Sequence, residues 1–144
     1  MDEYFKKISS STHLNWIYDI ELAMKIYKDN PDSYSVLFPF MYSYLEECIR
    51  SLTTEFGKNL LLDKKRYTVG TELINLAIEE NSENKELVDL LEEYRKYFKK
   101  STIFDEGDNR NSVSHGYTHP ILWTKENFEE LVKDIARLSD FDIM

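Results

Sequence analysis

Apolar residues recur at spacings of three and four along most of this 144-residue chain. That spacing places side chains on one face of an α-helix, which turns once in about 3.6 residues. The most apolar stripe contains six residues: Leu37, Met41, Tyr44, Leu45, Cys48 and Leu52. Four glycines and three prolines are too few for a turn-rich β-chain. The sequence therefore predicts an all-α protein, a helical bundle of about five or six helices that forms a single domain over residues 1–144.

Capping residues and helix breakers divide the chain into the expected helices. A first apolar stripe covers residues 4–27, and the run Ser9–Thr12 is compatible with a break in it, because serine and threonine are weak helix formers. A second helix should follow Asn30-Pro31 and run to about Phe56. Further helices should begin near Val69, after Ser82 as the N-cap, after Asp108 or Asn109, and after Thr124.

The charge of the chain limits the partners that it can bind. The formal net charge is −9, so nucleic acid cannot bind over the whole surface, and a nucleic-acid site must be local or must gain charge by pairing two chains. Two basic clusters, at residues 63–66 and 95–100, are typical of solvated faces, with phosphate or RNA contact as the alternative. Glu46 and Glu47 are adjacent, which places them on different helix faces, and solvent exposure is favoured for both, although Glu46 could reach a neighbouring cleft.

Cysteine usage and hydropathy indicate the compartment. Cys48 is the single cysteine, which excludes an intrachain disulfide and a cysteine metal cluster, and its apolar stripe indicates a small core residue. The first residues lack the apolar core of a signal peptide. The longest uncharged run, residues 33–45, is too short to span a bilayer. We expect a cytoplasmic protein without membrane contact.

The segment 110–117 concentrates the chemistry of the chain. Arg110 and His115 are a minimal set for phosphoryl transfer, because a guanidinium binds phosphate in bidentate geometry and an imidazole carries a proton near neutral pH. Asn111 is four residues from His115, so both share a helix face, and it can orient a hydroxyl or a phosphate oxygen. Tyr117 can stack on a base or donate a hydrogen bond.

The same side chains also have a purely structural interpretation. Arg110 can pair with Asp105 or Asp108, while His115 forms a hydrogen bond near the helix end. His119 lies four residues beyond His115, a spacing compatible with metal binding, but a glycine breaks the helix between them and a clear third ligand is lacking. We therefore expect no metal and no cofactor.

The pattern formed by Arg110, Asn111, His115 and Tyr117 resembles the signature of the HEPN superfamily. That signature is an arginine, usually a polar residue, three variable positions and a histidine, with a tyrosine two residues later in many members. The resemblance at residue level is confined to this segment, and the position of the motif in the last third of a helical chain fits it. In many members the helix continues after the tyrosine, whereas Gly116 and Pro120 interrupt it here, so the subfamily stays open.

The resemblance implies a helical bundle that forms a homodimer, with two motifs facing each other across a cleft. It implies His115 as base or acid, Arg110 as the group that stabilises the phosphorane, and Asn111 and Tyr117 as residues that bind or orient the substrate. The expected function is a metal-independent endoribonuclease of a bacterial toxin–antitoxin, abortive-infection or other defence or stress system. RNA is the expected substrate, and a cognate antitoxin or regulatory protein is a further expected partner. The alternative is a catalytically silent HEPN-like dimer that binds a partner protein or a nucleotide.

Overall fold

The structure, a computed structural model, describes residues 1–56, 68–100, 102, 104–116 and 118–141. These residues form seven α-helices and no strand: α1 (Asp2–Ser11), α2 (Ile17–Asp29), α3 (Tyr34–Ser51), α4 (Gly70–Glu80), α5 (Lys85–Tyr94), α6 (Arg110–Ser114) and α7 (Lys125–Leu138). Short 3-10 helices extend or connect them: η1 (Pro31–Ser33), η3 (Arg95–Phe98), η4 (Pro120–Leu122) and η5 (Ser139–Phe141). The all-α prediction is confirmed, and the helix count exceeds the expected five or six because the first stripe divides into α1 and α2. None of the described helices is both long and apolar enough to cross a membrane.

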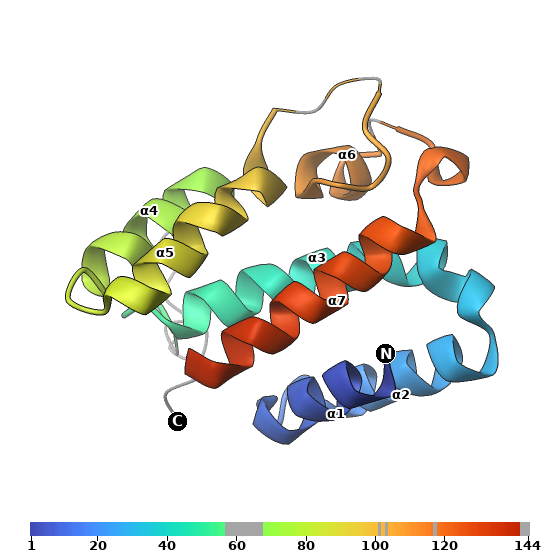
Figure 1. The fold of residues 1–144 in the computed structure, drawn as a ribbon, viewed down its shortest axis with the longest axis horizontal. Helices are drawn as coiled ribbons and strands as arrows, with labels where there is room; N and C mark the ends of the chain where they lie inside the picture. The colour runs from blue at the N-terminus through green and yellow to red at the C-terminus, as the bar shows by residue number, and fades with distance from the viewer. Residues whose placement is uncertain (57–67, 101, 103, 117, 142–144) are drawn as a thin grey trace.

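The helices α3 and α7 pack against each other through the middle of the fold (Figure 1). On one side lie α1 and α2, and on the other α4 and α5 form a second pair. Aromatic rings fill the space between the central helices, where the ring centroid of Phe38 is 5.3 Å from that of Phe128 and 5.8 Å from that of Trp123. The short α6 contacts α3 and η3, so the predicted motif is attached to the edge of this core.

Side-chain caps begin α5, α6 and α7. Thr124 begins α7 as predicted, since its hydroxyl accepts a hydrogen bond from the backbone N–H of Asn127 at 3.2 Å. The prediction for α5 is wrong, because Asn84 rather than Ser82 is the cap and accepts from the N–H of Leu87 at 3.2 Å. Asparagine and serine are equally good N-caps, and here residues 81–83 form a turn before the helix begins.

The helix α3 ends earlier than predicted, at Ser51 instead of near Phe56. The hydroxyl of Thr53 donates to a carbonyl in the last turn of α3 at 2.8 Å. Thr54 then donates to Glu80 at the end of α4, at 2.7 Å from its N–H and 2.6 Å from its hydroxyl. Because these side chains bind backbone and acid groups, they redirect the chain towards α4 before the helix can continue.

Candidate active site

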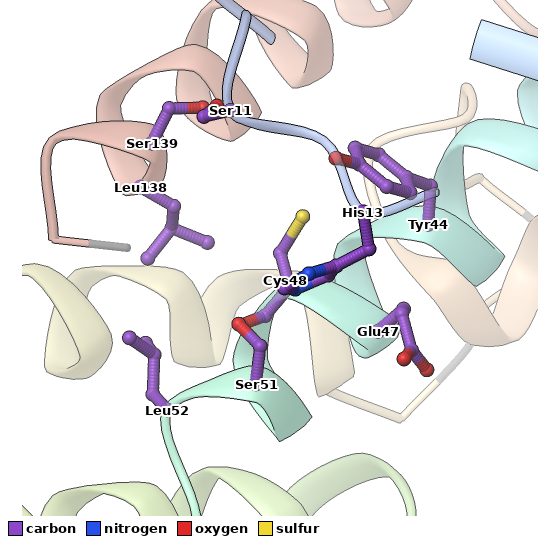
Figure 2. Close-up of a pocket in the computed structure, with 9 residues that line it drawn as sticks. All are labelled: Ser11, His13, Tyr44, Glu47, Cys48, Ser51, Leu52, Leu138 and Ser139. Carbon is purple, nitrogen blue, oxygen red and sulfur yellow. The ribbon is translucent and has the colours of Figure 1, made fainter. Parts of the chain in front are cut away.

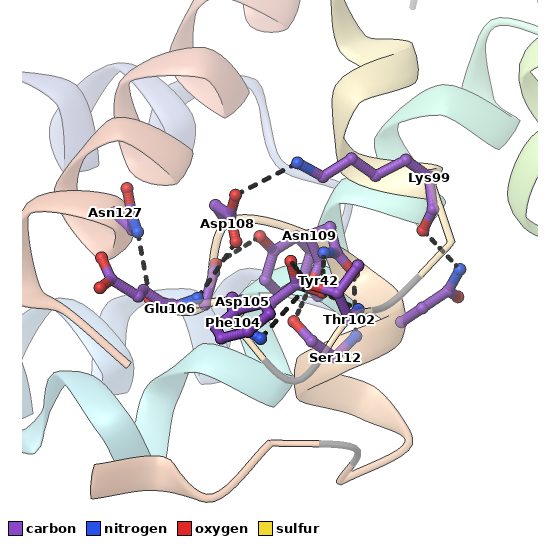
Figure 3. A network of polar contacts seen from close by, with 12 residues as sticks. Tyr42, Lys99, Thr102, Phe104, Asp105, Glu106, Asp108, Asn109, Ser112 and Asn127 are labelled. Carbon is purple, nitrogen blue, oxygen red and sulfur yellow. Dashed lines mark hydrogen bonds and ion pairs between the residues drawn. The ribbon is translucent and has the colours of Figure 1, made fainter. Parts of the chain in front are cut away.

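A buried network around Asn109 holds the motif helix α6 in place (Figure 3). Asn109 is completely buried; its side chain accepts from the N–H of Ser112 at 2.9 Å and donates to Asp105 at 2.8 Å. The hydroxyl of Ser112 donates back to the carbonyl of Asn109 at 3.0 Å. A helix of five residues is too short to be stable alone, so these contacts maintain it.

Asp105 completes this network as a carboxylate. Beyond Asn109, it accepts hydrogen bonds from the N–H of Thr102 at 2.7 Å and from the hydroxyl of Thr102 at 3.1 Å. Burial raises the pKa of Asp105, but the hydrogen bonds from the Thr102 backbone, the Asn109 amide and the Thr102 hydroxyl outweigh it, so this pKa lies below its ordinary value. Its charge is therefore satisfied inside the loop.

The turn before α6 is anchored to two other elements. The hydroxyl of Tyr42 in α3 donates to the carbonyl of Gly107 at 2.7 Å, and Lys99 forms an ion pair with Asp108 at 3.3 Å. Gly107 has φ +89°, and a Cβ there would lie 3.0 Å from the Phe38 ring. Any other residue would be strained at this φ and its Cβ would also press against the buried Phe38 ring, which explains a glycine at this point.

Gly116 ends α6, as the sequence predicts. Its φ is +64°, its N–H donates to the carbonyl of Val113 at 3.3 Å, and the N–H of His115 donates to the carbonyl of Asn111 at 3.2 Å. This left-handed ending is favourable for glycine and satisfies carbonyls of the last turn. It leaves the His115 side chain exposed at the end of the helix.

The guanidinium of Arg110 lies at the centre of the motif. Its Nη1 donates to Asn111 Oδ1 at 3.1 Å and lies 3.2 Å from His115 Nε2. Because a guanidinium has donors only, Nε2 is the acceptor in this contact, and the proton of the neutral imidazole is then on Nδ1. The acidic partner of Arg110 is Glu46, at 3.3 Å from Nη2, rather than a residue of the turn before α6.

Glu46 is the site residue that the sequence did not assign. The prediction of solvent exposure is wrong, because the Glu46 and Arg110 side chains are only 12% and 17% exposed. Its second oxygen accepts from the N–H of Gly70 at 3.0 Å, so Glu46 connects α3, α4 and α6. Glu47 is also half-buried and pairs with Arg50 at 3.4 Å. The available signal was the uncharged run 33–45, which marks the surrounding helix as buried.

The structure brings together three of the four predicted site residues. Asn111 contacts Arg110 through Oδ1, and its Nδ2 donates to the carbonyl of Lys99 at 3.0 Å. Tyr117 and the basic cluster 63–66 lie outside the described residues. His119 is exposed, and within the described ranges no group of three or more His, Cys, Asp or Glu side chains is arranged to hold a metal.

A separate hollow lies beside Cys48 and is lined by the side chains that Figure 2 shows. It is lined by residues of α3, the end of α7 and the segment that includes Ser11 and His13. Its volume is about 20 Å³, enough for roughly one water molecule. Cys48 is half-buried and packs against the core, in keeping with a structural role.

The chain matches no known family model, and no curated protein or solved structure is significantly similar to it.

Proposed function

We propose that this protein is a metal-independent endoribonuclease of the HEPN type. One observation carries the proposal: Arg110 Nη1 lies 3.2 Å from His115 Nε2 at the end of α6, where the histidine is exposed. A cation that can bind phosphate is thus adjacent to a group that can transfer protons. Phosphoryl transfer requires that combination, because charge develops on the phosphate while a hydroxyl is deprotonated.

Arg110 keeps donors for a phosphate while it is held in place. Its Nη1 contacts Asn111 and His115, and its Nη2 contacts Glu46. Within the described part of the chain, Nε makes no hydrogen bond. A guanidinium carries an N–H on Nε and two on each terminal nitrogen, so Nε–H and one Nη2–H are left to bind two phosphate oxygens.

In the proposed reaction, the phosphate binds Nε–H and Nη2–H of Arg110, and the substrate's 2′-hydroxyl replaces Nη1 as the hydrogen-bond partner of His115 Nε2. Nε2 then takes the proton of the substrate's 2′-hydroxyl, and the 2′-oxygen bonds to phosphorus. The bond between phosphorus and the 5′-oxygen breaks, and an acid protonates that oxygen. The products are a 2′,3′-cyclic phosphate and a 5′-hydroxyl, and Arg110 stabilises the phosphorane between the two steps.

A homodimer supplies the acid that this reaction needs. One motif has a single histidine, whereas the reaction uses a base and an acid. A two-fold axis beside α6 would place two His115 and two Arg110 side chains in one cleft, and two-fold pairing is the commonest form of self-association. It would also double the positive charge at the point where a chain of net charge −9 must bind RNA.

The resemblance of the motif supports a role in a cytoplasmic bacterial defence or stress system of the toxin–antitoxin or abortive-infection kind. A cognate antitoxin or regulatory protein would then control it by covering the motif.

The second candidate function is a catalytically silent dimer that binds a partner protein or a nucleotide. The ion pair between Glu46 and Arg110 favours it, because a half-buried carboxylate neutralises the cation that would bind phosphate. The net charge of −9 favours it as well.

Cleavage of single-stranded RNA in EDTA distinguishes the two functions. We expect the purified wild-type protein to cut, and His115→Ala to lose most of the activity. His119→Ala is the matched control, because His119 is also exposed and four residues away. A wild-type protein that is inert on RNA would favour the silent module, and equal losses in both variants would contradict a specific role of His115.

A further inference from the structure

We infer that single-stranded RNA runs from the motif over Lys99 into a hollow between α4 and η3, where Arg95 and Lys99 bind its phosphates. The inference rests on the proposed endoribonuclease function, and it names the path that the substrate takes away from the cleavage site.

The hollow combines a polar rim with an apolar floor. Its volume is about 160 Å³, and it is lined by Thr71, Ile74, Arg95, Phe98 and Lys99. The side chains of Ile74 and Phe98 belong to the core, so the floor is rigid. Pockets that enclose a whole small molecule usually have about 300–1,000 Å³. This hollow therefore suits one part of a polymer, such as a base on the floor and a phosphate at the rim.

Two hydrogen bonds join this hollow to the motif. On one side, the carbonyl of Lys99 accepts from the side chain of Asn111 at 3.0 Å. On the other side, Gly70, the neighbour of Thr71, donates its N–H to Glu46 at 3.0 Å, and Glu46 holds Arg110. The hollow therefore lies next to the motif, and an RNA chain bound at Arg110 would reach it next.

The charge around this hollow differs from the rest of the acidic chain. The segment 95–100 carries four cations in six residues and no acid, whereas the chain has a net charge of −9. The hollow between α5 and α7 is lined by four carboxylates, those of Glu86, Asp89, Glu93 and Asp140. The hollow between η3 and α7 is lined by two carboxylates, those of Asp108 and Glu130, and by two lysines, Lys96 and Lys99. Among the described residues, the lining of the α4–η3 hollow has two cations and no carboxylate, so of the three hollows it is the one whose lining most favours RNA.

The cations at the rim can exchange their present partners for phosphates. Arg95 pairs with Glu92 at 2.6 Å and Lys99 pairs with Asp108 at 3.3 Å, but all four side chains are more than one-third exposed. Exposed pairs of this kind are weak, so a phosphate can replace the carboxylate. Lys96 is different, because it pairs with Asp134, which is 2% exposed, and we leave it out of the RNA path.

A binding experiment tests the path without relying on cleavage. The probe is a short fluorescent RNA with 2′-O-methyl groups, which cannot be cut by 2′-hydroxyl attack. We expect Arg95→Gln combined with Lys99→Gln to weaken its binding about tenfold at low salt. The slope of log K against log salt should fall by about 1.4, since each single-strand phosphate contact contributes about 0.7. Arg95→Lys combined with Lys99→Arg keeps the charges and should keep the slope.

The matched control is Lys25→Gln combined with Lys28→Gln on α2, which removes the same charge from exposed ion pairs elsewhere. Equal weakening in the control, or an unchanged slope in the Arg95 and Lys99 variant, would overturn the inference. If wild-type protein cuts RNA while that variant has an unchanged KM, the path is wrong and the function stands. If the probe binds through Arg95 and Lys99 but cleavable RNA is not cut, the RNA path is supported and the proposed endoribonuclease activity is refuted. A wild-type protein that does not bind the probe refutes the path directly.

Discussion

Replacing Glu46 by glutamine tests how the site is held together. Glutamine has nearly the same shape, but it removes the charge that faces Arg110, and its single oxygen can accept only one of the two hydrogen bonds that Glu46 accepts on separate oxygens. Glu47→Gln is a closely matched control, since Glu47 is the next residue of α3 and pairs with Arg50 at a similar distance and exposure. Only Glu46 faces the motif.

The expected loss of stability follows from the contacts. A hydrogen bond to a charged group contributes about 1.5–3 kcal/mol and a neutral one about 0.5–1.5 kcal/mol, so neutralising the acid costs about 1 kcal/mol per bond. From the described residues, Glu46 accepts two bonds, from Arg110 and Gly70, and Glu47 accepts one, from Arg50. We expect losses of about 2 and about 1 kcal/mol, which lower the Tm by about 8 °C and about 4 °C in a chain of this size.

The effect on catalysis should separate the two variants. With Glu46→Gln the guanidinium is less firmly held, so kcat for RNA cleavage should fall about tenfold. KM should not rise, because removing a negative charge beside the phosphate favours binding. Glu47→Gln should leave kcat and KM within about twofold of the wild type. Equal kcat in the two variants, measured as initial rates at saturating RNA, would refute the role of Glu46 in positioning Arg110.

Further predictions concern the motif, the loop before it and the assembly. Asn111→Ala should lower the initial rate less than His115→Ala, because it removes an orienting acceptor and keeps the proton carrier; an equal loss would contradict this. His115→Ala should leave the Tm unchanged, whereas Arg110→Ala should lower it by leaving a half-buried carboxylate unpaired. The pKa of the Asp105 carboxyl is lower in the folded protein than in the unfolded chain, so its contribution to stability is complete above the unfolded pKa and is lost as the pH falls through the folded pKa. Between about pH 5 and lower pH, Asp105→Asn should therefore lose less stability on acidification than the wild type. Light scattering at micromolar concentration should give twice the chain mass, and specific activity should fall on dilution. A monomeric mass would contradict the shared-cleft mechanism.

Much of the fold follows from signals that are local in the sequence. The last helix is an example, since Thr124 caps it, and Leu131, Ile135 and Leu138, which recur at spacings of four and three, are all buried. Gly116 ends α6 for an equally local reason, its positive φ. Such features depend on a few neighbouring residues, so periodicity and capping rules predict them.

The sequence predictions are wrong where contacts between distant segments determine the structure. The early end of α3 depends on Thr54 meeting Glu80, which is 26 residues away. The partner of Arg110 is Glu46, which is 64 residues away, although two acidic residues close to Arg110 in sequence were the expected partners. Asp105, one of those nearer acids, instead accepts hydrogen bonds from Thr102 and Asn109 within the loop, and no rule based on neighbouring residues predicts this.

The most direct test of the proposed chemistry is the dependence of cleavage on a single 2′-hydroxyl. The substrate is a single-stranded DNA that contains one ribonucleotide, incubated with wild-type protein in EDTA. We expect one cut, on the 3′ side of the ribonucleotide, with a 2′,3′-cyclic phosphate end identified by mass spectrometry, and no cut with His115→Ala. Cleavage of the all-DNA control, or a 3′-hydroxyl end at the cut, would contradict 2′-hydroxyl attack promoted by His115.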